Sequence, residues 1–444
     1  MKVTLIKPNI GRMEHSLYID EGRMEPLQLG VIAGLTPKEY EVVLVDDRME
    51  EIPYDEKTDL VAITVETFTA RRSYEIAKEF RDRKIPVIMG GFHPTLIPEE
   101  VLEHADSIFT GDAEGTWHEV LNDLKTTGNL KRIYKSGTGI GQLGGFHPRR
   151  DLFLKKGYLP VTLTQFGRGC IFGCDFCAIS SFFNQRHHTR PISEVIKELQ
   201  TEHKRYVFFV DDNIVANKEE AKKLFRALIP LKLKWISQGS IDMLHDPELM
   251  ELMVKSGCLG NVIGLESISP EALREMKKSP NLAEFDGYET QMNMLRNYGL
   301  QTWAAFTLGH DWERKEDIYK TLDFALKHKF TFAAYNILVP YPNTPLYKRL
   351  KEEGRLLYDG KWWLHPDYRF NYAPLRPKNM TADELTETVL EIRKKWNSFP
   401  FMIKRFFDPK TNFSSFERAL IFWAYNPLFK RETFKKHGMR FGQD

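Results

Sequence analysis

Residues 169–177 read Gly-Cys-Ile-Phe-Gly-Cys-Asp-Phe-Cys and bring Cys170, Cys174 and Cys177 close together along the chain. Proteins commonly hold an iron–sulfur cluster with four cysteine thiolates. Three thiolates in so short a stretch predict a cluster in which one iron atom lacks a protein ligand. That iron is left open to bind another molecule.

Zinc binding and disulfide bonding are the alternatives for these cysteines. A structural zinc site needs four ligands, commonly in CxxC or HxxxH pairs. The available fourth ligands, His187 and His188, lie farther along in a stretch rich in arginine and aromatic residues. The chain has only four cysteines, and the remaining one, Cys258, is predicted to be a buried free thiol in a reducing compartment. Both alternatives are therefore disfavoured.

The length and composition of the sequence are typical of a soluble globular protein of two or three domains. Its 444 residues are too many for one ordinary domain, and 42% hydrophobic residues are enough to bury substantial cores. A net charge of +2 gives no case for a nucleic acid as the main partner. The N-terminus does not read as a signal peptide, and no apolar run approaches the roughly 20 residues of a membrane span. We expect a cytoplasmic protein.

The CxxxCxxC spacing, with aromatic Phe176 just before the last cysteine, resembles the signature of radical S-adenosylmethionine (SAM) enzymes. The resemblance implies a 4Fe–4S cluster ligated by Cys170, Cys174 and Cys177. In that family the open iron holds the amino and carboxylate groups of SAM. An electron from the cluster then cleaves SAM to methionine and a 5′-deoxyadenosyl radical.

Residues 1–145 alternate between strand and helix patterns and form the first predicted domain. In the stretch Ser73–Arg83, Tyr74, Ala77 and Phe80 recur at helical spacing. Strands that alternate with helices imply a parallel sheet covered on both faces, which is a doubly wound, Rossmann-like α/β fold. The predicted strands are Val3–Ile6, Val42–Val45, Leu60–Val65, Val87–Met89 and Ser107–Thr110.

Four polar loops of this domain follow its predicted strands, at residues 8–11, 64–67, 90–95 and 111–115. Folds of this class bind ligands beyond the carboxyl ends of their strands. Each loop taken by itself is better interpreted as an ordinary turn between a strand and a helix. Four such loops in matching places favour a ligand.

The loops resemble the N-terminal cobalamin-binding domain of a large subgroup of radical SAM enzymes. The Asp-x-His-x-x-Gly run, whose histidine ligates cobalt in many such domains, is missing from residues 1–145. The resemblance therefore implies either cobalamin whose lower face is not held by that histidine, or a domain that has lost cobalamin and covers the active site. The implied cobalamin-binding residues are Thr64, Thr67, Gly90, Gly91, His93, Thr95 and Glu114.

A glycine-containing linker over about 128–160 leads into the second predicted domain, residues 146–350. Six strand–helix units there make an open, partial (β/α)6 TIM-type barrel, the fold of the radical SAM core. The cysteines follow its first strand, at the carboxyl edge where barrel enzymes place their chemistry. The predicted strands are Val161–Phe166, Tyr206–Val210, Trp235–Ser240, Val262–Leu265, Thr302–Leu308 and Ala333–Val339.

The resemblance also implies residues at this edge that hold SAM. Asp212 and Asn213 stand where the family often has a run that contacts the SAM amino group, and their oxygen atoms can accept from an ammonium. Glu266 ends the fourth strand, where an acidic residue of the family faces SAM. The other implied cofactor-binding residues are Phe176, Ser240 and Gly309.

Residues 351–444 form the third predicted unit, which is helical. Thr381 and Glu384 are placed as a capping box for the helix Leu385–Trp396. Beyond it, aromatic and basic residues interleave. We interpret them first as a helical cap that packs on the open side of the barrel. The alternative is a lining for a large apolar substrate, with contact to a membrane surface.

The combined resemblance implies a cobalamin-dependent radical SAM enzyme that methylates an unactivated carbon of an unidentified small-molecule or lipid-like substrate. It also implies an external one-electron donor of the flavodoxin or ferredoxin type. Three alternatives stay open: a non-methylating radical enzyme, such as an oxidative cyclase, a C–C bond former or a rearrangement catalyst, with or without cobalamin; a methylthiotransferase; and a non-enzymatic metal-binding protein. The methylthiotransferase is disfavoured because residues 1–145 contain no cysteine.

Overall fold

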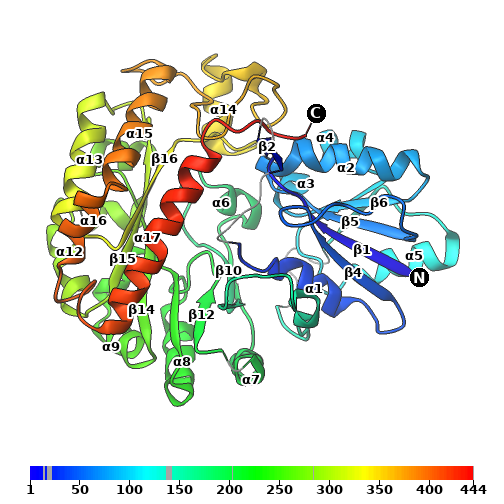
Figure 1. Ribbon diagram of the computed structural model, residues 1–444, viewed down its shortest axis with the longest axis horizontal. Helices are drawn as coiled ribbons and strands as arrows, with labels where there is room; N and C mark the ends of the chain where they lie inside the picture. Colours follow the sequence, from blue (N-terminus) through cyan, green and yellow to red (C-terminus); the bar gives the residue numbers. More distant parts are fainter. Residues whose placement is uncertain (14–15, 18–22, 137–142, 203, 284, 444) are drawn as a thin grey trace.

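Two parallel sheets, one in each half of the chain, form the framework of the molecule (Figure 1). The computed structural model describes residues 1–13, 16–17, 23–136, 143–202, 204–283 and 285–443. Part of the predicted linker, residues 137–142, lies outside the described residues. The segment that carries the cysteines lies between the two sheets (Figure 1).

The N-terminal sheet is parallel, in the order β4-β1-β5-β6-β7-β8. Its central strand β5 is buried along most of its length, as expected for a sheet covered by helices on both faces. The five predicted strands are confirmed, and the edge strand β8 is additional. The bounds are β1 (Lys2–Lys7), β4 (Glu41–Asp46), β5 (Leu60–Thr64), β6 (Val87–Gly90), β7 (Ser107–Thr110) and β8 (Ile133–Lys135), with a separate two-stranded pair β2 (Arg12–Met13) and β3 (Ser16–Leu17).

The helices of this half pack their apolar stripes onto the sheet. In α2, the predicted stripe of Tyr74, Ala77 and Phe80 is buried. The helix begins three residues earlier than its sequence pattern suggested. The bounds are α1 (Leu27–Leu35), α2 (Ala70–Asp82), α3 (Phe92–Leu96), α4 (Pro98–His104) and α5 (Trp117–Thr127).

The second sheet is the predicted open barrel, with strand order β16-β15-β14-β13-β12-β9. All its strands are parallel, and β9 and β16 form its two edges. Cys258 begins β14 as a buried free thiol, as predicted. The bounds are β9 (Thr162–Thr164), β12 (Tyr206–Phe209), β13 (Lys234–Gln238), β14 (Cys258–Glu266), β15 (Gln301–Leu308) and β16 (Phe332–Ile337).

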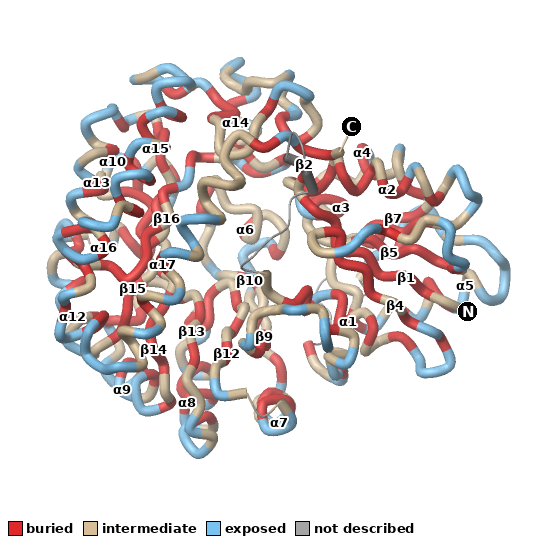
Figure 2. The backbone as a smooth tube through the Cα atoms, viewed as in Figure 1, coloured by how far each residue is buried: buried red, intermediate tan, exposed pale blue. Residues whose placement is uncertain are grey.

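Helices cover the outside of this barrel, and the buried strands lie inside them (Figure 2). Asp246 and Ser269 cap α9 and α10, each directly before a proline at the first helical position. The bounds are α7 (Ile192–Glu202), α8 (Lys218–Leu228), α9 (Pro247–Lys255), α10 (Pro270–Glu275), α11 (Ser279–Leu282), α12 (Glu289–Asn297), α13 (Lys315–Lys327) and α14 (Pro345–Glu352).

The C-terminal residues divide between the two halves instead of building a core of their own. Helix α15 (Ala382–Trp396) begins at the predicted capping box and packs on the barrel, followed by α16 (Phe399–Phe406) and α17 (Phe416–Lys436). Other C-terminal residues join the core of the N-terminal half: Trp362, Trp363, Tyr368 and Phe441. These residues therefore tie the first domain to the barrel.

Within the described part of the chain, none of the helices has the length and apolar character needed to cross a membrane.

Candidate active site

The cysteine loop, residues 170–177, lies between a short antiparallel ribbon and helix α6. The ribbon is β10 (Gly167–Gly169) paired with β11 (His187–Thr189). Gly169 has a φ of +84°, and a Cβ there would lie 2.0 Å from the Arg186 carbonyl oxygen, so the ribbon requires glycine directly before the loop. At the other end, Cys177 is the N-cap of α6 (Ala178–Phe183). The loop is therefore fixed at both ends.

The three thiols are suited to an iron–sulfur cluster. Cys174 is buried, which raises the pKa of its thiol to about 12, and burial also raises the pKa of Cys170. Among the described residues, no three His, Cys, Asp or Glu side chains converge on a single ion. Each thiolate of a four-iron cluster binds a different iron atom, so the cysteines need not converge. A bound cluster would hold the thiols deprotonated despite their burial.

The end of β12 holds the ribbon and reaches the loop. The Gly169 amide donates to the Asp212 carboxylate at 2.7 Å. The Asn213 side-chain nitrogen lies 3.7 Å from Cys170 Sγ and 3.0 Å from Ser240 Oγ. The structure therefore brings the predicted residues Asn213 and Ser240 together beside Cys170. The third predicted residue, Asp212, binds the backbone of Gly169, which directly precedes that cysteine.

Glu266 and Lys278 form a buried ion pair beside the same loop. Lys278 Nζ lies 2.9 Å from one Glu266 oxygen, and Thr307 Oγ1 donates to the other at 2.7 Å. The ammonium also lies 6.0 Å from the centre of the Phe176 ring. Burial works against its charge, but Glu266 and the Cys174 thiol hold the pKa of Lys278 well above its usual range. A buried cation fits beside thiolates that carry a cluster.

Gly309 lies at the end of β15, as predicted, but is packed against the C-terminal helices. Its φ is +106°, and a Cβ there would lie 2.5 Å from Leu385 Cδ2. Its amide donates to the Glu313 carboxylate at 2.7 Å. Packing therefore accounts for glycine at this position, and contact with SAM stays a prediction.

A cavity of about 390 Å³ separates the carboxyl edge of the N-terminal sheet from the cysteine ribbon. Gly91 lies in its wall with a φ of +113°, and a Cβ there would lie 3.0 Å from the Val65 carbonyl oxygen. Apolar walls and bare backbone at an open sheet edge fit cobalamin. No histidine is found among the described residues that line the cavity. The predicted residues that line it are Thr64, Gly90, Gly91, Glu114 and, from the barrel, Asp212.

Three residues predicted to bind cobalamin lie behind this wall instead. His93 is fully buried, with Nε2 3.2 Å from the Glu100 carboxylate and Nδ1 3.3 Å from Thr67 Oγ1. Helix α3 turns its side chain into the core, towards Trp363, whose indole donates to Glu100 at 2.8 Å. In this structure the side chains of His93 and Thr67 support the loop from behind, and their direct contact with cobalamin stays a prediction.

Thr95 has the same supporting role. Its hydroxyl donates to the Gly91 carbonyl at 2.9 Å and accepts from the Gly111 amide at 3.0 Å. It joins two of the loops that form the cavity wall, without lining the cavity itself. Direct contact of Thr95 with cobalamin likewise stays a prediction.

Arg168 joins the two halves across the cavity and was missed by sequence reasoning. Its guanidinium lies 3.1 Å from Asp112 and 2.7 Å from Glu114, and it donates to Gln165 at 2.6 Å. Its position between two glycines directly before Cys170 was the available signal. Lys278 was also missed, because nothing in its sequence surroundings marks it.

The fold and this site define the class of protein to which the chain belongs. The chain matches the radical SAM superfamily over residues 164–325 and the B12 binding domain over residues 21–121. It belongs to the radical SAM enzymes that carry a B12-binding domain. Its cofactors are a 4Fe–4S cluster, SAM and cobalamin, as the sequence predicted.

The relatives include methyltransferases and an anaerobic magnesium-protoporphyrin IX monomethyl ester cyclase. The bacteriochlorophyllide d C-8(2)-methyltransferase of Chlorobaculum tepidum is 30% identical over 76% of this chain and 78% of that protein. The C-12(1)-methyltransferase of the same organism is 26% identical over 98% of this chain and 94% of that protein. The solved radical SAM methyltransferase TsrM of Kitasatospora setae, with cobalamin and a 4Fe–4S cluster bound, shares the fold. Its TM-score is 0.62 at 19% identity, and the match covers 79% of this chain and 78% of that one.

Proposed function

We propose that this enzyme transfers a methyl group to an unactivated carbon of a large apolar substrate. The observation that carries the proposal is the cavity shared by the N-terminal sheet and the cysteine ribbon, which Arg168 and Asp212 line from the barrel side. When bound, the cluster supplies the electron that splits SAM, and cobalamin carries the methyl group. The predicted ranges 1–145, 146–350 and 351–444 then serve as cobalamin domain, radical core and helical cover.

Within this proposal, the residues beside the cysteine loop hold SAM. Asn213 and Ser240 offer oxygen acceptors for its ammonium next to Cys170. Glu266 is paired with Lys278 at 2.9 Å, and that ammonium lies 6.0 Å from the centre of the Phe176 ring of the loop. Burial strengthens each of these polar contacts, because little water competes for them.

Product analysis tests the proposal. Reconstituted protein with cluster, cobalamin, a chemical reductant and SAM is expected to form S-adenosylhomocysteine in addition to 5′-deoxyadenosine when given a methyl acceptor. A panel of tetrapyrrole and polycyclic lipid acceptors would supply the substrate. Formation of 5′-deoxyadenosine with an altered acceptor, but never S-adenosylhomocysteine, would refute methyl transfer and favour a cyclase or another non-methylating radical reaction.

An exposed aromatic face supports an apolar substrate taken from a membrane surface. Phe399 and Phe416 are 63% and 85% exposed, which is unusual for large apolar side chains. Lys404 and Lys410 are exposed in the same segment of the chain, whereas Asp408 is buried against Arg296. We define the aromatic face by its exposed members in α16, α17 and the loop between them: Phe399, Ile403, Phe407, Phe413, Phe416 and Leu420.

The protein is therefore expected to bind vesicles that contain anionic phosphatidylglycerol more tightly than neutral phosphatidylcholine vesicles. Aromatic side chains insert at the interface and lysines attract anionic lipid. The double variant that carries Phe407→Ser and Phe416→Ser is expected to co-sediment severalfold less with the phosphatidylglycerol vesicles. Leu154→Ser, at a residue 70% exposed outside the face, is the matched control. If the double variant changed only self-association and left vesicle binding intact, the membrane assignment would be wrong.

A further inference from the structure

The middle of the cysteine loop lines two open hollows that share no described lining residue with the cavity. Cys174 lines an open hollow together with Gly173, Ser181 and Lys348. The next residue, Asp175, lines an adjoining hollow with Trp312. Pro345, the first residue of α14, lines both hollows, so they form one continuous surface over the middle of the loop.

Cations surround this surface. Lys277, Arg314, Lys348 and Lys378 are exposed there. Lys277, Arg314 and Lys348 form no ion pair with any residue that the structure describes. We name these four cations, together with Trp312, the donor face.

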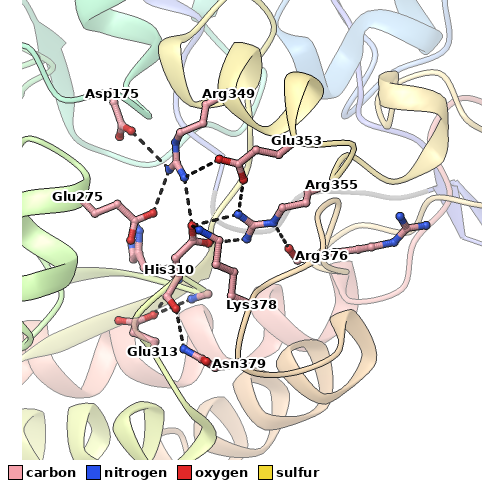
Figure 3. A network of polar contacts seen from close by, with 12 residues as sticks. Asp175, Glu275, His310, Glu313, Arg349, Glu353, Arg355, Arg376, Lys378 and Asn379 are labelled. Atoms are coloured by element: carbon pink, nitrogen blue, oxygen red, sulfur yellow. Dashed lines mark hydrogen bonds and ion pairs between the residues drawn. The ribbon is translucent and has the colours of Figure 1, made fainter.

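The acidic residues of the same surface are already neutralised. Arg349 extends from α14 towards Asp175 and Glu275, at 3.7 Å and 2.9 Å (Figure 3). Asp311 lies 3.2 Å from Arg349 and 2.9 Å from Lys378, and Arg355 also contacts it. The cations that lack partners therefore set the sign of the surface, which is positive.

An exposed indole completes the donor face. Trp312 is 63% exposed, although a tryptophan normally buries most of its large apolar surface. Aromatic residues are enriched at the centres of protein interfaces. A positive rim around an aromatic residue fits a partner with an acidic rim and an apolar centre.

We propose that the donor face docks a small acidic one-electron carrier protein with a flavin or iron–sulfur centre. This inference rests on the proposed function, because a cluster held by Cys174 must receive an electron before SAM can be split. The carrier loses one electron and the cluster gains it; no bond forms and no proton moves. Thr95 and Leu96 of the N-terminal half also line the hollow at Cys174, but neither hollow shares a described lining residue with the cavity, so the donor face gives the carrier a separate approach to the cysteines.

A charge-reversal variant tests the docking site by direct binding. Flavodoxin, as the probe, is titrated onto the cluster-loaded enzyme at low and high salt. Lys277→Glu with Lys348→Glu is expected to raise its Kd by about tenfold at low salt and to flatten the salt dependence. The matched control is Lys38→Glu with Lys125→Glu, which reverses two exposed lysines of the N-terminal half. The single variant Lys348→Glu leaves residue 277 unchanged. It therefore shows whether a loss of binding comes from the donor face or from a disturbance of the neighbouring Lys278.

A small reductant separates docking from chemistry. With dithionite, the double variant is expected to cleave SAM at the wild-type rate; with reduced flavodoxin, its rate falls along with binding. Unchanged flavodoxin affinity, or an equal loss with dithionite in both donor-face variants, would overturn the docking site. Failure of the wild type to cleave SAM with dithionite would refute the proposed function, while the binding titration would still decide the docking site.

Discussion

Replacing Cys174 with alanine is expected to abolish cluster binding and all SAM cleavage while leaving the chain folded. Iron content after anaerobic reconstitution should fall from about four atoms per chain to less than about one, because two thiolates cannot retain the cluster. Activity should drop by at least roughly 10³-fold, since no other group in the site can supply the electron. Iron and sulfide analysis measures cluster content, and the formation of 5′-deoxyadenosine measures SAM cleavage. Thermal unfolding of the unloaded protein checks that the chain is still folded.

Cys258→Ala is the matched control for this prediction. Cys258 is a buried thiol of the barrel core, on β14, and it lies outside the cysteine loop. Its removal leaves only a small cavity, so a modest loss of stability of about 1 kcal/mol is expected, with iron content unchanged. If Cys174→Ala kept its iron, or Cys258→Ala lost it, the assignment of the ligands would fail.

Much of the fold follows from local sequence patterns. Strands such as β5 and β15 are apolar runs bounded by turns, and α2 shows its stripe at helical spacing, so each unit is recognisable by itself. Parallel strands then place their following loops at one edge. That geometry, together with the family resemblance, placed Asn213 and Ser240 at the same edge as the cysteines, and the structure adds the contact between them.

The buried position of His93 and the contacts of Arg168 depend on interactions between distant parts of the chain. Trp363 reaches Glu100 across 263 positions, and that contact fixes the side of α3 on which His93 lies. A histidine in a glycine-rich loop therefore resembled a ligand but serves as a core residue. Arg168 is similar, because its partner Glu114 belongs to the other half of the molecule. Sequence patterns carry no information on such pairings.

The ion pair between Glu266 and Lys278 gives the second large expected effect. Lys278→Met leaves the Glu266 carboxylate at the end of β14 with Thr307 as its remaining partner, in a site where the Glu266 side chain is 9% exposed. Removing one member of a buried ion pair typically costs about 3–5 kcal/mol. The variant is therefore expected to unfold at a clearly lower temperature and to lose affinity for SAM.

The double variant Lys278→Met with Glu266→Gln separates stability from binding. With both charges removed, most of the stability is expected to return, because no buried charge is left unpaired. SAM binding, measured calorimetrically on the cluster-loaded protein, is expected to stay weak, since the negative charge of the carboxylate predicted to face SAM is gone. Lys255→Met breaks a surface pair whose members are 63% and 60% exposed, and should change neither quantity.

The result for the double variant decides the role of the pair. If SAM affinity returned together with stability, Glu266 and Lys278 would only support the end of β14, and SAM would be held without the Glu266 carboxylate. If neither SAM affinity nor stability returned, both charges would be needed to hold the backbone at the end of β14. There Glu266 has a φ of +63°, a backbone conformation that a non-glycine residue adopts only when its surroundings hold it.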